Sequence, residues 1–315
     1  MAGSSLKAAL SANFIIGVIK TIVGFFTGSA AMISEAYHSF ADTFNQILLL
    51  IGVNRSKKEP DIEHPFGYKK VQFFWAFVVA VLIFGVSGGL ALFEGIEIIL
   101  HPSDHEFHPE YFPWQIAVLS VAIILESFAL KTAINEAQAY QKKVKSEKLL
   151  EAVEEMQDPV LLSLLVEDSL ALAGLIIALI GSIITFVTEN PIWDGITAIS
   201  IGIVLMIGGI LLARENKRYL IGVSVSTRIK SQIKDMVENF EGVVQLNSMK
   251  TMILGPDDML LALEVTFETY VIESDNGVAD EIDKLEIELC KLVPKLTPNK
   301  IFIESQVPKI ISEEQ

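Results

Sequence analysis

The segment that decides the fold covers residues 30–53 and reads AAMISEAYHSFADTFNQILLLIGV. It can cross a membrane, because a spanning helix needs about 20 mostly apolar residues. His38 and Asp42 nevertheless lie within this apolar run. An ionisable side chain in the hydrocarbon region costs several kcal/mol, so such residues usually have a function. The segment therefore predicts a membrane fold with a binding site inside it.

Five further apolar runs of suitable length occur, all before residue 214. They cover residues 10–26, 71–100, 114–133, 161–187 and 192–212. The whole chain of 315 residues is 51% hydrophobic and only 20% charged. We therefore expect an all-α bundle of six transmembrane helices over residues 1–213, followed by a second domain over residues 214–315. We also expect the first apolar run to be retained, because no signal-peptide cleavage site follows it.

The basic residues alternate between connections, which predicts the orientation. They gather between the second and third runs, between the fourth and fifth, and after the sixth, while the other connections have none. These residues are Arg55, Lys57, Lys58, Lys69, Lys70, Lys142, Lys143, Lys145, Lys148, Arg214, Lys217 and Arg218. Basic loops stay in the cytoplasm. We expect a multi-pass integral membrane protein with both termini cytoplasmic, in the plasma (inner) membrane if the source is prokaryotic.

The second domain has the patterns of a small soluble fold. A polar helix is expected at residues 227–240, and a second, amphipathic helix at 278–292. Strands are expected at residues 243–253, 259–269 and 300–305, with a hairpin turn at 255–258. The order α-β-β-α-β predicts an α+β sandwich, in which two helices cover one face of a three-stranded sheet.

Three ionisable residues in the second and fifth runs are the candidate metal ligands. His38 and Asp42 are four residues apart, so both project from one helix face. In the fifth run Glu167 and Asp168 diverge by about 100°, so at most one can face His38, and Glu167 can face a neighbouring helix or water instead. At about 1.5 Å per residue, Asp42 and Asp168 both lie near the middle of the hydrocarbon core. Imidazole and carboxylate ligands suit zinc and related cations.

A further carboxylate, Glu126, falls at the same depth in the fourth run. It is a candidate fourth ligand or proton carrier. Alternatively, it pairs with Lys20 of the first run, and the pair only holds helices together. The sequence leaves both possibilities open.

The motifs SEAYHSFAD at residues 34–42 and HPFGY at 64–68 resemble those of the cation diffusion facilitator family, which includes zinc transporters of animals and zinc–proton antiporters of bacteria. The resemblance covers nearly the whole chain. It implies a six-helix bundle with a cytoplasmic domain similar to metallochaperones, of ferredoxin-like type. It also implies a homodimer that exchanges metal for protons by alternating access. The resemblance places transport ligands at His38, Asp42 and Asp168.

The chain departs from the family pattern at three places. Leu164 occupies the fourth ligand position, which a water, Glu126, Glu167 or Asn45 can fill; fewer nitrogen ligands weaken the preference for zinc over manganese or iron. In the loop of residues 59–70, Asp61 and His64 match a metal site of some members, but Tyr68 takes the third position, so no tight site is expected. The second domain contains no histidine, which argues against zinc bridging there.

The sequence therefore predicts a secondary active transporter that exports a divalent cation, zinc foremost, in exchange for protons. A manganese- or iron-preferring member, or a transport-inactive regulatory scaffold, is the alternative. An enzyme is not expected, because an intramembrane zinc hydrolase needs several histidines in the spans and only His38 lies in one. The expected partners are the cation, protons, a second copy of the chain and the lipid bilayer. Nucleic acid is excluded by the net charge of −15, and no prosthetic group is expected.

Overall fold

The computed structural model describes residues 2–306, apart from Ser29, 103–108, 145–147, 150–152, 154–156 and 275–276. The chain forms two compact units. The first comprises Met1–Lys58 and Val71–Lys217, and the second comprises Glu59–Lys70 and Arg218–Gln315. The second unit thus includes a loop that comes from between two helices of the first.

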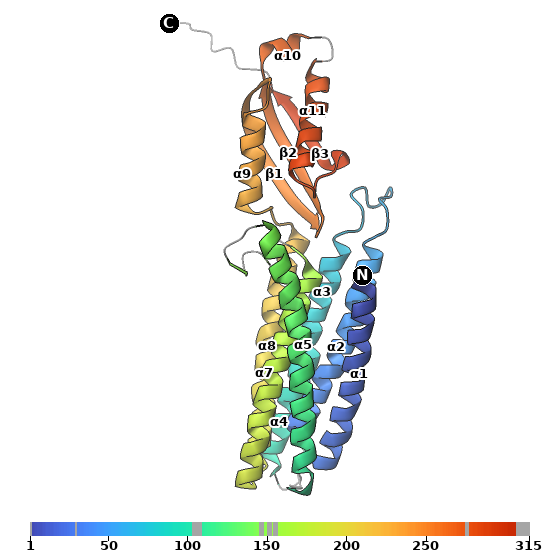
Figure 1. The fold of residues 1–315 in the computed structure, drawn as a ribbon, viewed down its shortest axis with the longest axis vertical. Coiled ribbons are helices and arrows are strands. Elements are labelled where there is room, and N and C mark those ends of the chain that lie inside the picture. Colours follow the sequence, from blue (N-terminus) through green and yellow to red (C-terminus); the bar gives the residue numbers. More distant parts are fainter. Residues whose placement is uncertain are drawn as a thin grey trace. The chain divides into compact units, whose positions relative to one another are not determined.

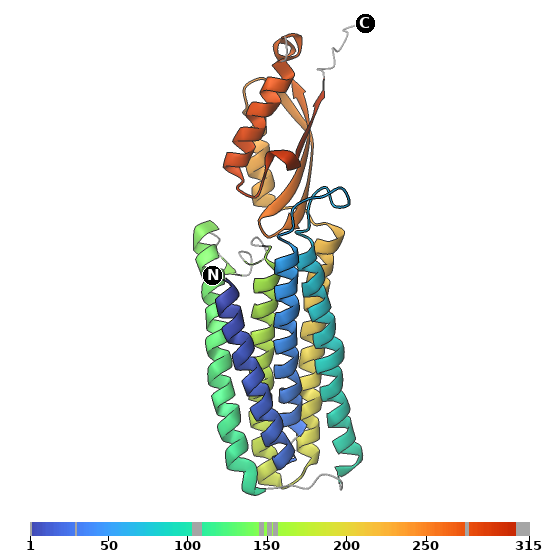
Figure 2. The ribbon, with the colours of Figure 1, turned by 90° about the vertical axis from the view of Figure 1, so that its right-hand side faces the viewer.

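Long helices that lie side by side make up the first unit (Figures 1 and 2). They are α1 (Ala2–Thr27), α2 (Ala30–Arg55), α3 (Val71–Leu82), α4 (Gly89–Leu100), α5 (Phe112–Val144), α7 (Pro159–Thr188) and α8 (Ile192–Ile221). A π-helical segment, η1 (Ile83–Gly88), joins α3 to α4, so that residues 71–100 form one continuous run. Each apolar run of the sequence therefore corresponds to a helix.

Four helical runs of the described chain are long and apolar enough to cross a membrane. These are Val71–Leu100, Phe112–Lys142, Pro159–Thr188 and Ile192–Ile221. In α1 the described apolar part is shorter, Asn13–Thr27. Helix α2 has the length, but its polar residues lower its hydropathy. The membrane character of the helical unit follows from the four runs, whereas spans at α1 and α2 stay a prediction.

Glycines allow two of the spanning helices to approach closely. A Cβ atom on Gly95 of α4 would lie 2.6 Å from the carbonyl oxygen of Gly195 in α8. A Cβ atom on Gly202 of α8 would lie 2.9 Å from the carbonyl oxygen of Gly88. Small residues at such crossings let helix backbones pack directly, as is common in membrane bundles. The rest of the interior is filled by aliphatic side chains such as Leu49, Val79 and Leu175.

The second unit contains a three-stranded sheet with two helices on one face (Figure 2). Its elements are α9 (Thr227–Glu238), β1 (Val243–Gly255), β2 (Asp258–Phe267), α10 (Thr269–Glu273), α11 (Gly277–Leu292) and β3 (Ile301–Gln306). Strand β2 is central, antiparallel to β1 and parallel to β3. The predicted α-β-β-α-β order is correct, except that the last predicted residue of the second strand begins the short helix α10.

Alternation along β2 explains why the helices cover only one face of the sheet. Leu261, Leu263 and Val265 are buried, and they face the helices with Ile233 of α9 and Leu285 of α11. The residues between them on β2 are only partly buried. This period-2 pattern is typical of an antiparallel pair with one face on the core.

The loop Glu59–Lys70 packs against residues of the other face of the sheet. Phe66 contacts Phe302 of β3 edge to face, with 6.2 Å between ring centroids. The Nζ atom of Lys70 donates to the sulfur of Met252 in β1 at 3.3 Å. Partial burial lowers the pKa of Lys70. This docking was not predicted from the sequence, because nothing local in residues 59–70 specifies a distant strand as its partner.

Candidate cation site in the helical unit

Helix α2 places a row of polar side chains on its buried side. Asp42 is 4% exposed and Asn45 is 0% exposed, whereas Phe44 and Ile47 between and beside them face outward. The three-residue step from Asp42 to Asn45 keeps both on one helix face. His38 lies one turn before Asp42 in α2, but its side chain lies outside the described residues. The predicted His38–Asp42 pair therefore stays a prediction.

Helix α7 turns Glu167 rather than Asp168 into the interior. Ser163, Glu167 and Ala171 follow one another at four-residue steps along its buried stripe. Asp168 and Leu164 are only partly buried. Of the two adjacent acids, Glu167 is therefore the one enclosed by neighbouring helices, which the 100° spacing alone could not decide.

A hydrogen bond connects these two helices. The Nδ2 atom of Asn45 donates to Oε1 of Glu167 at 2.8 Å, and both residues are buried. The other oxygen of each side chain, Oδ1 of Asn45 and Oε2 of Glu167, has no hydrogen-bond partner within the described part of the chain. The same holds for Oγ of Ser163 and Oε1 of Gln46. Each such buried polar atom costs about 1–3 kcal/mol, so the cluster is suited to take up a ligand.

Lys20 of α1 is fully buried beside this region. Its Nζ atom donates to Oγ of Ser39 in α2 at 2.9 Å. The Lys20 ammonium interacts electrostatically with the carboxylates of Asp42 and Glu126. Since Glu126 of α5 is also buried, both sequence-based interpretations of Glu126 stay open.

The carboxylates of three helices come within electrostatic range of one another. Asp42 interacts in this way with Glu126, Glu167 and Asp168. No three His, Cys, Asp or Glu side chains converge to hold a metal ion among the described ones, a set that excludes the His38 side chain. The arrangement is an acidic, buried cluster from α2, α5 and α7, and the complete ligand set stays a prediction.

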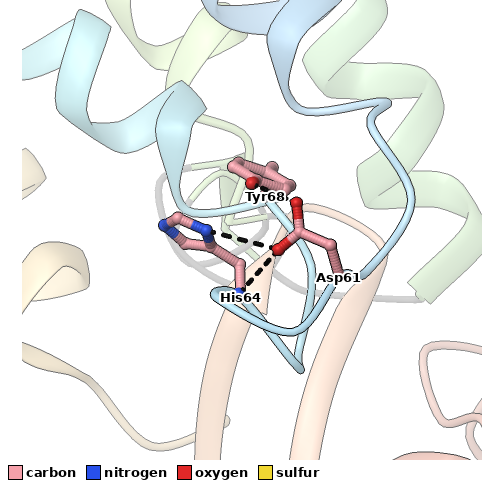
Figure 3. A network of polar contacts seen from close by, with 3 residues as sticks. All are labelled: Asp61, His64 and Tyr68. Carbon is pink, nitrogen blue, oxygen red and sulfur yellow. Dashed lines mark hydrogen bonds and ion pairs between the residues drawn. The ribbon is translucent and has the colours of Figure 1, made fainter.

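A second polar cluster, in the loop Glu59–Lys70, has its hydrogen bonds made internally (Figure 3). The hydroxyl of Tyr68 donates to Oδ2 of Asp61 at 2.6 Å. The backbone N–H of His64 donates to Oδ1 of Asp61 at 2.8 Å, and His64 Nδ1 lies 3.6 Å from the same oxygen. Tyr68 thus donates to a carboxylate oxygen that a metal ligand would need, and the expectation of no tight metal site here stays a prediction.

Comparison with known proteins identifies the family. The profile of the cation efflux transmembrane domain matches residues 6–221, more than half of the chain. The chain belongs to the cation efflux family. The resemblance to cation diffusion facilitators is therefore confirmed, and the helical unit is that of a multi-pass membrane protein.

Two of the three relatives described here are named for metal transport or tolerance. The mouse mitochondrial proton-coupled zinc antiporter SLC30A9 is 29% identical over 287 residues, which are 91% of this chain and 50% of the relative. Metal tolerance protein C4 of Arabidopsis thaliana is 28% identical over 270 residues, 85% of this chain and 58% of the relative. The magnetosome protein MamM of Paramagnetospirillum magneticum is 36% identical over 114 residues, 36% of this chain and 35% of the relative. The chain spans about half the length of the first two relatives.

Sequence reasoning did not single out Ser163 and Gln46, which are buried and have an oxygen without a hydrogen-bond partner in the described part of the chain. Helical spacing contains the signal, since Ser163 precedes Glu167 by four residues and Gln46 follows Asp42 by four. Both are uncharged, and a lone serine or glutamine in an apolar run attracts less attention than a carboxylate. Their lack of a hydrogen-bond partner is visible only in three dimensions.

Proposed function

We propose that this member of the cation efflux family carries a divalent metal cation, zinc foremost, across a membrane in exchange for protons. The observation that carries the proposal is the Asn45–Glu167 hydrogen bond, which brings the polar rows of α2 and α7 against each other inside apolar helices. Buried carboxyl groups outnumber the single amine of Lys20 in this described cluster, so their deprotonation on metal binding would give the cluster the charge to hold a cation. The names of the relatives support the same cargo class.

In this proposal the cation is bound by His38, Asp42 and Asp168. Leu164 offers no ligand, so the fourth position falls to water or to one of the neighbouring residues Glu126, Glu167 and Asn45. Metal binding requires neutral imidazole, and histidine titrates near physiological pH. Protonation of His38 would therefore release the cation and couple its export to proton uptake. An oxygen-rich set would also accept manganese or iron, which is the alternative cargo.

The transport cycle follows from the proposed topology. Six spans with cytoplasmic termini would place the acidic cluster near the middle of the bilayer. Rocking of the bundle would expose the site to each side in turn, as in other secondary transporters. Two copies of the chain would form the working unit.

Zinc uptake into proteoliposomes tests the proposal. The replacement of Asp42 or Asp168 by alanine should abolish uptake. The elution profile and the thermal unfolding of each purified variant should remain those of a folded chain. Asp61→Ala, in the loop cluster, is the matched control and should retain uptake. Full uptake by either site variant would refute the site assignment, and a folded wild-type protein without uptake of zinc, manganese, iron or cadmium would favour the transport-inactive scaffold.

A further inference from the structure

The residues of α2 and α7 that have unpaired oxygens lie on one side of Asp42 and Asp168 along the helix axes. Asn45 lies one turn beyond Asp42, about 4.5 Å further along the helix axis. Ser163 lies five residues before Asp168, about 7.5 Å away along α7. The end of α2 and the start of α7 lie at the same end of the bundle (Figure 2). The cluster therefore points towards the end at which the basic connections occur, which is cytoplasmic in the predicted orientation.

The atoms available in this cluster are all oxygens. They are Oδ1 of Asn45, Oγ of Ser163 and Oε2 of Glu167, each buried and without a hydrogen-bond partner in the described part of the chain. The bond from Asn45 Nδ2 holds the Glu167 carboxyl group against α2, and its second oxygen is buried. The described part of the chain gives these oxygens no partner, and water or a cation can supply one.

The ligand types indicate which cation suits the cluster. Carboxylate, amide and hydroxyl oxygens with no nitrogen or sulfur favour hard cations such as Mn²⁺ and Mg²⁺, which retain water ligands. Three protein oxygens leave room for such waters. Metal binding requires deprotonated ligands, and the carboxylate that Glu167 would then present makes a cation a better partner here than a neutral molecule.

We propose that Asn45, Ser163 and Glu167 form a second cation site, built only from oxygen ligands. This assignment leaves water or Glu126 for the fourth position of the transport site. It receives a partly hydrated divalent cation between the cytoplasmic end of the bundle and the site at Asp42 and Asp168. The inference rests on the proposed function, because the second site lies on the path to the transport site. Its looser ligand set would hold the cation weakly, so that the cation passes on once it loses its waters.

Binding of Mn²⁺ to the purified full-length chain tests this proposal. Binding is measured as the loss of the free Mn²⁺ signal in electron paramagnetic resonance. The double replacement Asp42→Ala with Asp168→Ala removes the proposed transport site. In that background one weak Mn²⁺ site should remain. Adding Glu167→Gln should weaken it about tenfold or more, because the amide removes the charge yet still accepts the Asn45 bond.

Two serines of α7 provide a matched pair of variants in the same background. Ser163→Ala removes an unpaired hydroxyl of the second site and should weaken Mn²⁺ binding several-fold. Ser182 is equally buried, but its Oγ accepts a hydrogen bond from Gln115 at 2.8 Å. Ser182→Ala should leave the Mn²⁺ affinity unchanged.

The inference fails if the double variant, folded by thermal unfolding, binds no Mn²⁺, since the cluster then holds only water. It also fails if Glu167→Gln leaves the remaining affinity unchanged. Should the double variant not fold, the wild-type chain gives the same answer, because Glu167→Gln should reduce two bound Mn²⁺ per chain to one. The proposed function is tested separately. It is wrong if the wild-type protein takes up no zinc, whether or not Mn²⁺ binds.

Discussion

Two polar clusters of this protein use similar residue types in opposite ways. In the loop, Asp61 accepts hydrogen bonds from Tyr68 and from the His64 backbone at the surface. Between α2 and α7, Glu167 accepts one bond from Asn45, and its second oxygen, with those of Asn45 and Ser163, has no partner among the described residues. The first cluster completes its own hydrogen bonds, and the second leaves oxygens available inside apolar helices.

The difference shows how a structural group can be distinguished from a binding group. Exposed polar atoms can exchange a lost partner for water, so a local network mainly shapes the loop. Buried polar atoms in a membrane helix have no such replacement, and leaving them unpaired is costly. Their presence in the helical unit supports our proposal that the cluster takes up the transported cation.

The largest expected effect concerns Lys20, the buried ammonium beside the second cluster. Lys20→Met removes the cation with which the carboxylates of Asp42 and Glu126 interact. Loss of one partner from a buried charge pair typically costs about 3–5 kcal/mol, so the thermal unfolding midpoint in detergent should fall sharply. Lys131→Met, at an exposed position of α5, should leave the midpoint unchanged.

Adding Glu126→Gln to Lys20→Met sharpens this result. Recovery of both stability and transport would mean that Glu126 and Lys20 only hold helices together. Recovery of stability without transport would mean that Glu126 serves as a ligand or proton carrier. An unchanged midpoint for Lys20→Met alone would contradict the charge balance described above.

The next effect compares one carboxylate from each cluster. Glu167→Gln should lower the initial rate of zinc uptake about tenfold, because it removes a buried acidic group that can become a carboxylate next to the transport site. Asp61→Asn should change the rate by less than about twofold, since it lies in a loop where its partners can reach water. Both rates are measured in proteoliposomes at matched protein content. Equal rates for the two variants would show that burial does not separate the clusters by function.

A smaller effect is expected from the two serines of α7 in metal-free buffer. Ser163→Ala removes a buried hydroxyl that has no partner, so stability should stay level or rise slightly. Ser182→Ala leaves the amide of Gln115 without its acceptor and should cost about 1 kcal/mol. Thermal unfolding with a chelator present compares them. A larger loss for Ser163→Ala than for Ser182→Ala would mean that Ser163 has a structural partner.

The smallest effect belongs to Tyr68 in the loop. Tyr68→Phe removes the bond to Asp61 and should cost about 0.5–1.5 kcal/mol locally. Zinc affinity, measured by titration calorimetry, should remain that of the wild-type chain. A marked loss of affinity would show that the loop cluster takes part in metal binding after all.

Much of the fold could be predicted from the sequence because membrane helices and alternating strands have strong periodic patterns. The six apolar runs coincide with helices, and the hairpin at residues 255–258 lies between β1 and β2. The π-helical turn at Ile83–Gly88 and the docking of Phe66 on Phe302 could not be predicted. Both depend on how distant elements pack rather than on local composition.

The candidate site was predictable only in part. Asp42, Asn45 and Glu167 were all named from the sequence, but the rotation of α7 that buries Glu167 beside Asn45 depends on its contacts with α2 and α5. Adjacent acids on a helix look alike in sequence, although they project about 100° apart. The unpaired hydroxyl of Ser163 has no sequence signal beyond its spacing from Glu167.

The most direct test of the central claim is metal-driven proton movement across the membrane of proteoliposomes. Wild-type protein should move protons when a zinc gradient is applied, reported by a pH-sensitive dye trapped inside the vesicles. Asp42→Ala in the same membranes should move none. Absence of zinc-dependent proton flux with folded wild-type protein, or an equal flux with Asp42→Ala, would contradict the conclusion that the buried cluster of α2 and α7 carries the cation.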